Sequence, residues 1–272
     1  MLFLSTHANA CGSIEQAQNL AMLHNRFLIL YFSETNGSHC KTPQAFFWLN
    51  AEDGQLLDQY DKYTVYNEDR KSLKKYHITS LPTVVIVDGN GIELYRYNDY
   101  KNPTGMKEAL QNFVIPKNFL INDLYNFHQH ATFESAVRIS HLYLDYSLMV
   151  DEKFRENVFN ISQSYLAEAQ RFMKKKSYNV EKSQKLELLK LFHLAYAKQF
   201  VLLNNQLAVW NISALNENNK NEFYFLRYIA SKGLLKKDDV SWEQLVLQRE
   251  GFENYLKKAQ AILTQIEISQ TN

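Results

Sequence analysis

The chain has 272 residues, 46% of them hydrophobic and 22% charged, which is enough for two domains of ordinary size. A formal net charge of +1 and the lack of long basic runs argue against nucleic acid or an acidic membrane surface as the main partner. No window approaches the roughly 18 consecutive apolar residues of a membrane-spanning helix. Two cysteines, Cys11 and Cys40, exclude the disulfide framework of a small secreted scaffold, while a bridge between them stays open.

The first residues have features of a secretory signal peptide. Ala8-Asn9-Ala10 has the small-x-small pattern of a cleavage site, but the apolar stretch from Met1 to Leu4 is shorter than the roughly 7–15 residues expected. Residues 1–12 are therefore interpreted as a tail or a signal-peptide remnant, with lipidation of Cys11 left open. This favours a periplasmic or secreted protein of the bacterial envelope. A genuine start at Met1 would instead favour the cytoplasm.

Two domains are indicated by a change in composition near residue 116. All four prolines lie at or before that position, and no glycine occurs between Gly105 and Gly233. Because proline and glycine interrupt regular structure, the first part is typical of mixed α/β structure and the second of helices joined by polar connectors. The predicted limits are 13–116 for the α/β domain and 117–272 for an α-helical domain.

The first domain shows alternating strand and helix patterns. In chain order they predict a helix at 14–25, a strand at 27–32, a helix at 40–50, a strand at 62–66, a helix at 68–76, strands at 83–87 and 92–97, and a helix at 104–113. Ser13 is the expected N-cap of the first helix, with Gln16 completing a capping box. The apolar run 27–32 predicts a strand buried on both faces. Asp88-Gly89-Asn90-Gly91 predicts a hairpin turn.

The second domain repeats apolar residues at helical spacing. Helices are predicted around 133–143 and 154–172, and then at 180–204, 206–215, 220–232 and 241–268. Gly233 is expected to end one helix as a C-cap, and Ser241 with Gln244 to start the last. Helices of this kind form a bundle or a short helical array, and no consensus recurs at a fixed period of about 34 residues.

The order of these elements resembles a known superfamily. Strand 27–32 runs into Ser33-Glu34-Thr35-Asn36-Gly37-Ser38-His39-Cys40-Lys41, and Ser80-Leu81-Pro82-Thr83 precedes the hairpin. Over residues 13–115 this pattern is similar to the thioredoxin-like superfamily. The resemblance implies an α/β thioredoxin-like fold, with a central mixed sheet flanked by helices, followed here by an all-α domain. It also implies a cis peptide bond before Pro82, opposite the Cys40 turn.

The active-site turn departs from the family pattern. Where thioredoxins carry Cys-x-x-Cys, this chain carries Gly37-Ser38-His39-Cys40. Dithiol exchange needs one thiolate to attack and a second thiol to resolve the mixed disulfide, so the cycle cannot close within this loop. Tyr31 occupies the position of the buried acid that helps deprotonate the resolving thiol in the family. Cys40 is then either a vestigial thiol or a catalytic monothiol, with His39 as the neighbour that could favour its thiolate.

Other chemistries find little support in the sequence. His39 and Cys40, together with His24 or His77, are ligand types for copper or zinc, but no spacing brings them together, and neither a metal nor another cofactor is expected. The Asp88–Gly91 segment is a turn and not a phosphate-binding loop. Trp210, Tyr224 and Trp242 are interpreted as core residues rather than as a ligand cage.

A binding role remains. In the family, the backbone of the residue before the cis-proline, here Leu81, pairs with an extended peptide and needs no cysteine. The predicted groove consists of Gly37, Ser38, Leu81 and Pro82, with polypeptide or a partner protein as the occupant, held also by the helical domain. The sequence thus favours a redox-related protein-binding module of the cell envelope. The alternative is a monothiol disulfide oxidoreductase in which Cys40 works with an external resolving thiol. A structural assembly factor is a third hypothesis, and the sequence leaves open whether the protein is an enzyme.

Overall fold

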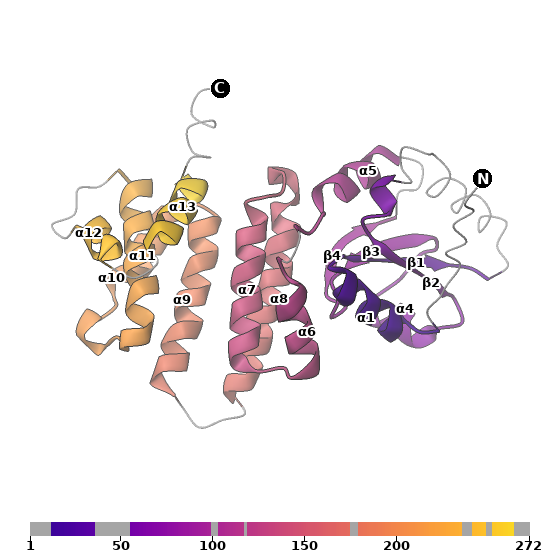
Figure 1. Cartoon of the computed structure of the whole chain (residues 1–272), viewed down its shortest axis with the longest axis horizontal. Coiled ribbons are helices and arrows are strands. Elements are labelled where there is room, and N and C mark those ends of the chain that lie inside the picture. Colours follow the sequence, from indigo (N-terminus) through magenta and orange to yellow (C-terminus); the bar gives the residue numbers. More distant parts are fainter. Residues whose placement is uncertain are drawn as a thin grey trace. The chain divides into compact units, whose positions relative to one another are not determined.

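The chain forms two compact units in the computed structural model (Figure 1). The structure describes residues 12–35, 55–98, 103–116, 119–174, 179–235, 241–248 and 252–263. Residues 1–131 and 150–161 make the first unit, which contains the sheet, and residues 132–149 and 162–272 make the helical unit. The predicted helix at 40–50 lies outside the described residues.

A mixed four-stranded sheet forms the centre of the first unit. Its order is β2-β1-β3-β4, with β1 and β2 parallel and the other two pairs antiparallel. The bounds are β1 Leu28–Ser33, β2 Asp61–Tyr66, β3 Thr83–Val87 and β4 Glu93–Tyr97. The two central strands, β1 and β3, are buried along their whole length, as their continuous apolar runs predict.

Helix α1 (Ile14–His24) begins at its predicted cap. Ser13 Oγ accepts a hydrogen bond from the Gln16 backbone N–H at 3.2 Å. The Gln16 side chain does not complete a capping box: its Oε1 accepts at 2.6 Å from the backbone N–H of Gly12, one residue before the cap. The Gln16 backbone N–H, which the helix start leaves without an intrahelical partner, is thus satisfied by the Ser13 cap.

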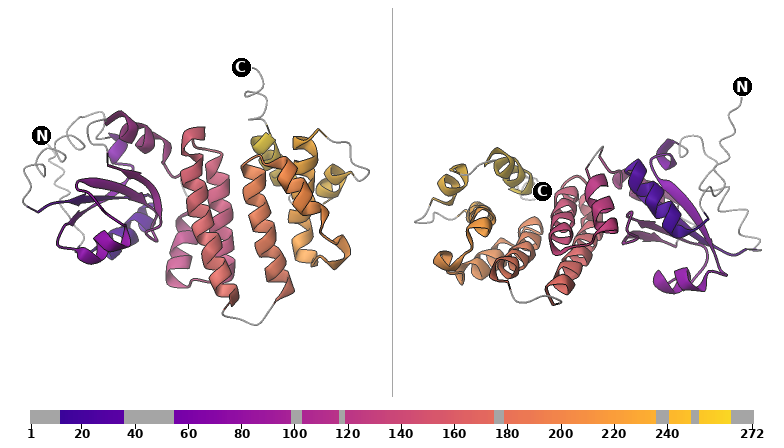
Figure 2. Two further views of the ribbon diagram at one scale, coloured as in Figure 1. Left: turned by 180° about the vertical axis from the view of Figure 1, so that it is seen from behind. Right: turned by 60° about the horizontal axis from the view of Figure 1, so that its bottom comes forward.

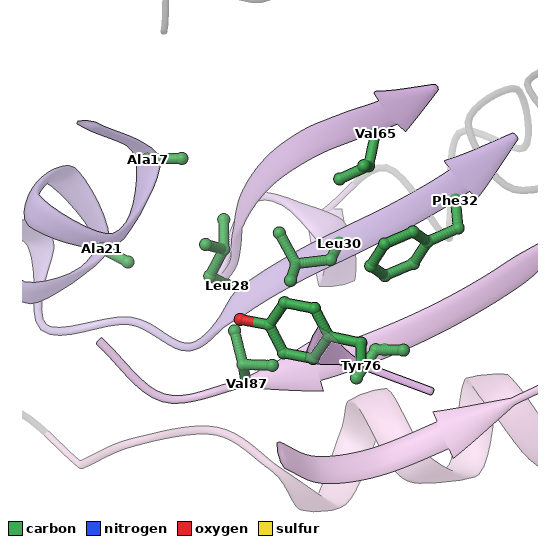
Figure 3. Close-up of a cluster of buried hydrophobic side chains, with 9 residues drawn as sticks. Ala17, Ala21, Leu28, Leu30, Phe32, Val65, Tyr76 and Val87 are labelled. Carbon is green, nitrogen blue, oxygen red and sulfur yellow. The ribbon is translucent and has the colours of Figure 1, made fainter. Parts of the chain in front are cut away.

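One core cluster of the first unit lies between α1 and the sheet (Figure 3). Leu28, Leu30 and Phe32 project from alternate positions of β1 onto one face, because side chains alternate across a strand. Ala17 and Ala21 face them from α1, and their small side chains let the helix approach the sheet closely. This cluster explains why a weakly amphipathic helix holds its place.

The β3–β4 hairpin forms around the predicted turn. Asp88 is buried, and its Oδ1 accepts hydrogen bonds from the backbone N–H groups of Asn90 and Ile92, each at 2.9 Å. Gly91 has a φ of +77°, which favours glycine. The turn chemistry seen in the sequence therefore produces the turn.

Helices α4 (Arg70–Lys75), α5 (Pro103–Asn112) and α6 (Ile121–Gln129) complete the first unit, and α6 packs against α1. The Tyr60 hydroxyl lies 2.6 Å from the carbonyl oxygen of Leu110 and 2.8 Å from that of Phe113. It is therefore a hydrogen-bond donor for carbonyl groups at the end of α5, which have no partner within the helix. The Phe154 ring lies 5.1 Å from that of Phe113, measured between centroids, which ties residues 150–161 to this unit.

The helical unit consists of helices that pack side by side (Figure 2). Its helices are α7 Phe133–Ser147, α8 Arg155–Lys174 (from residue 162 on), α9 Val180–Tyr196, α10 Phe200–Ala208, α11 Glu217–Gly233, α12 Trp242–Leu247 and α13 Phe252–Leu263. Ser140 on α7 and Ser162 on α8 are both fully buried, and each hydroxyl bonds the other residue's carbonyl oxygen, at 2.9 and 2.7 Å. These small residues allow the two helices to meet closely.

Three helix predictions in this unit are wrong in extent. The predicted helix 180–204 is two helices, because α9 ends at Tyr196, Lys198 takes a left-handed φ of +56° and α10 begins at Phe200. Phe200, Leu203 and Leu207 are buried from α10, so the apolar repeat continues across the break and hides it. Instead of the predicted helix 206–215, α10 ends at Ala208 and a 3₁₀ turn spans Ile212–Ala214. The predicted helix 241–268 is interrupted after Leu247.

Gly233 is not the C-cap that its position predicts. It is the last residue of α11, and the left-handed conformation occurs two residues later, at Leu235, with a φ of +52°. A Cβ atom at Gly233 would lie 2.5–2.7 Å from three ring carbons of Phe200. Glycine is therefore needed here because the Phe200 ring packs directly on the α11 backbone.

We expect Gly233→Ala to lower the free energy of unfolding of the helical unit by about 1–3 kcal/mol, because the Phe200 ring must move, although alanine has the better helix propensity. Urea unfolding followed by circular dichroism measures the change. Gly105→Ala in α5 is the control, because its Cβ would meet the Tyr97 ring at 3.5 Å, an ordinary contact. Equal stability of Gly233→Ala and wild type would show that the ring contact carries no weight.

Candidate functional site

The predicted site falls partly within the described residues. Gly37, Ser38, His39 and Cys40 lie outside them, so their roles stay predictions. Leu81 and Pro82 lie inside, and the peptide bond between them is cis, as the family resemblance implies. Both residues are half-buried, and Ser80 before them is exposed.

The strand register places Leu81 and Pro82 at one particular edge of the sheet. Phe32 on β1 pairs with Thr83 on β3 in antiparallel register. The residues just before Thr83 therefore lie at the end of β1, where the chain leaves the sheet towards Gly37 and Cys40. The end of β1 and the residues just before Thr83, which are far apart in sequence, therefore lie at the same edge of the sheet.

Hydrogen bonds order this edge. The Thr35 hydroxyl lies 2.9 Å from Asn67 Oδ1 and also contacts the Glu68 carboxylate, which links the residues that follow β1 and β2. The Thr83 hydroxyl donates to the carbonyl oxygen of Ser80 at 2.7 Å and closes the turn that contains the cis bond. The edge is therefore built by three segments: 33–35, 66–68 and 80–83.

Sequence reasoning missed Thr35, Asn67 and Glu68 as members of this edge. A signal was present, because each comes within two residues of the end of a strand, and the carboxyl ends of parallel neighbouring strands meet at one edge of a sheet. These residues supply hydroxyl, amide and carboxylate groups near the predicted groove. Such groups suit hydrogen bonding to a polypeptide backbone.

Tyr31 is buried within β1, with 3% of its surface exposed. It pairs with Thr64 on β2 and Val84 on β3, so its backbone is at the centre of the sheet. A phenol does not replace a carboxylate as a proton acceptor near neutral pH. The chain thus has a buried phenol at the position where the family resemblance implies an acid.

Of the two histidines weighed as metal ligands, His24 has a carboxylate partner for its side chain, while His77 is contacted at its backbone. His24 Nδ1 lies 3.0 Å from both carboxylate oxygens of Asp61, before the start of β1 and so at the opposite end of that strand from Ser33. The His77 carbonyl accepts a hydrogen bond from Arg96 Nη1 at 3.3 Å. Within the described ranges, no group of three or more His, Cys, Asp and Glu side chains is placed to hold a metal ion.

The aromatic residues of the helical unit pack as a core. Tyr224 and Trp242 are buried, with ring centroids 6.3 Å apart, and the Trp210 ring lies 5.9 Å from that of Phe223. The Arg227 guanidinium lies 5.4 Å from the Trp242 ring centroid, so the cation over this ring belongs to the protein itself. A ligand cage is not indicated.

Comparisons with known proteins identify little. The chain matches no protein-family model and no curated protein. Among solved structures it is similar to a thioredoxin from Thermus thermophilus, with 19% sequence identity, 43% of this chain and 92% of that chain covered, and a TM-score of 0.32. The chain has a mixed four-stranded sheet with flanking helices, followed by a helix-rich remainder. This architecture is compatible with a thioredoxin-like domain followed by a helical domain. No helix in the described parts of the chain is both long and apolar enough to cross a membrane.

Proposed function

We propose that this chain is a thioredoxin-like protein with a degenerate active-site turn, and that it binds polypeptide instead of exchanging dithiols. The occupied surface would be the groove of Gly37, Ser38, Leu81 and Pro82, with the helical unit as a second contact. The bound chain would lie extended and pair with the backbone at Leu81, which extends the sheet edge.

The strand register is the observation that carries this proposal. Thr83 pairs with Phe32, so Leu81 and Pro82 lie near the end of β1, and Gly37–Cys40 follow that strand in the sequence. Tyr31 supports the loss of thiol chemistry, since a buried phenol occupies the position of the proton-accepting acid. The binding contact relies on backbone groups and therefore survives the loss of the first cysteine.

The experiment measures polypeptide binding without thiols. A reduced, carboxymethylated and fluorescently labelled α-lactalbumin serves as the probe, and anisotropy reports its binding to the full chain. We expect Ser80→Trp to weaken binding about tenfold or more, because Ser80 is exposed beside the groove and an indole would fill it. Leu81→Asp should act likewise, but Leu81 also packs against the core, so Ser80→Trp is the cleaner variant.

Two controls distinguish the groove from other causes. Leu23→Asp changes a leucine that is 63% exposed on α1 and should leave binding unchanged. Cys40→Ser should also bind as wild type does. Unchanged binding in both Ser80→Trp and Leu81→Asp would refute the groove and favour the structural assembly factor.

A parallel assay tests the enzymatic alternative. Reduction of insulin disulfides in the presence of dithiothreitol should proceed at the uncatalysed rate with wild type and with Cys40→Ser alike. Catalysis by wild type that disappears in Cys40→Ser would establish the monothiol oxidoreductase, with dithiothreitol as the external resolving thiol.

The location in the bacterial envelope is a second part of the proposal, and it is supported by the Ala8-Asn9-Ala10 pattern. N-terminal sequencing of the protein from its native cells is expected to show processing after Ala10. An intact Met1 in a cytoplasmic fraction would contradict it.

A further inference from the structure

A cluster of charged side chains lies in the interior of the helical unit. Lys258 on α13 reaches Asp145 on α7, with 2.9 Å between Nζ and Oδ2, and Lys185 on α9 pairs with Glu222 on α11. The exposed fraction of these four side chains is only 14–29%. Buried charges are costly unless they are paired, and here two cations balance two anions.

His141 stands at the centre of this cluster. It lies one turn before Asp145 on the same face of α7, and its Nε2 is 3.8 Å from Glu222 Oε1. Its ring packs edge-on against Phe192, with centroids 4.6 Å apart. The titratable groups around it are Asp145 on its own helix, Lys185, His193 and Tyr196 on α9, Glu222 on α11, and Tyr255 and Lys258 on α13.

The closed arrangement disfavours a proton on His141. Burial is the main cause that lowers its pKa well below the ordinary value, and the nearby ammonium groups of Lys185 and Lys258 lower it further. Burial acts in the opposite direction on Glu222, whose pKa is raised. Near neutral pH, the cluster therefore holds a neutral imidazole between two ion pairs.

Helix α13 is held to the unit by a small contact. It packs on α11 and α12 (Figure 1), and of its 12 residues, Ala259 and Ile262 are the buried ones. The Tyr255 ring lies tilted against that of Phe225, with centroids 5.1 Å apart, and Lys258 supplies the ion pair to Asp145. An element with so little buried apolar surface is among the first to open locally.

We propose that α13 is an acid-released cover over His141 and its two carboxylate neighbours, so that the protonation of His141 opens the helix. Opening admits water to the imidazole and removes the Lys258 charge. Both changes make the open form the better proton acceptor, and by linkage acid favours it. Above the ordinary histidine pKa near 6.5, His141 is neutral in both forms, and the opening equilibrium does not depend on its protonation. Below that value the open form binds a proton that the closed form resists, so each further unit of acid shifts the opening equilibrium up to about tenfold.

Glu222 sets the lower limit of this response. Its raised pKa means that the closed form binds a proton there more readily than the open form does, which opposes opening at lower pH. The window therefore runs from about pH 6.5 down to the pKa of Glu222.

Hydrogen exchange of the full chain at pH 7.5 and 5.5, corrected for the intrinsic pH dependence of exchange, tests this proposal. We expect the protection of residues 252–263 to fall about tenfold at the lower pH, while residues 163–174 of α8 keep theirs. In His141→Gln, and in His141→Phe, which preserves a ring against Phe192, the fall should be absent. His130→Gln, at an exposed position, is the control and should respond as wild type does.

Lys258→Met provides a second, independent test by the same hydrogen-exchange measurement. It removes the charge and keeps most of the side-chain stem, so α13 should exchange fast at both pH values. Equal protection of α13 at the two pH values in wild type, or an undiminished fall in both His141 variants, would overturn the proposal.

Discussion

We expect Phe225→Ala to lower the free energy of unfolding of the helical unit by about 3–5 kcal/mol. Phe225 is fully buried in α11, and its ring lies between those of Phe192, at 5.9 Å, and Tyr255, at 5.1 Å. The truncation leaves a cavity and removes both ring contacts, one of which holds α13. The loss is therefore larger than the transfer of the missing atoms alone would predict.

Urea unfolding by tryptophan fluorescence measures this change. A Trp48→Phe background leaves Trp210 and Trp242, which both belong to the helical unit, so the signal reports that unit. Leu202→Ala is the control, because Leu202 is 45% exposed on α10, and its cost should stay below about 1 kcal/mol. A similar cost for the two variants would contradict the assigned role of Phe225.

The stability of the helical unit is expected to fall on acidification between about pH 6.5 and pH 4. Burial lowers the pKa of His193 to about 4, while its side chain bonds Ser162 Oγ at 3.2 Å. The native state thus binds a proton on His193 less readily than the unfolded state does. The contribution of the neutral imidazole to the free energy of unfolding is therefore complete above the ordinary histidine pKa and is lost as pH falls towards the native value. The difference corresponds to about 3 kcal/mol.

His193→Gln, which retains a hydrogen-bonding side chain towards Ser162, should flatten the curve of unfolding free energy against pH over this range. The part contributed by His141 should remain. His130→Gln, at an exposed site, should reproduce the wild-type curve. A His193→Gln curve that runs parallel to wild type over the whole range would refute the assignment.

Local signals were sufficient for individual elements of the first unit. The apolar run of β1, the Asp88–Gly91 turn and the Ser13 cap each act within a few residues, and the structure confirms all three. The cis bond between Leu81 and Pro82 followed from a family pattern, and it is present in the structure. The roles of Gly37, Ser38, His39 and Cys40 rest on the motif alone.

The features that sequence reasoning missed depend on packing between residues far apart in the chain. The turn around Lys198 interrupts an apolar repeat that continues on both sides, so periodicity cannot locate it. The need for glycine at Gly233 arises from Phe200, which precedes it by a whole hairpin. Lys258 comes near His141 only after α7, α9, α11 and α13 have assembled, and helical spacing does not indicate that either residue lies in the interior.

The path of the chain limits how the protein can be divided. Residues 150–161 return to the first unit, where Phe154 meets Phe113 and Tyr95, and the same helix then continues into the second. A fragment that stops at residue 131 would leave those two aromatic rings without their third partner. Separate production of either half therefore calls for a redesigned junction within α8 and not for a simple truncation.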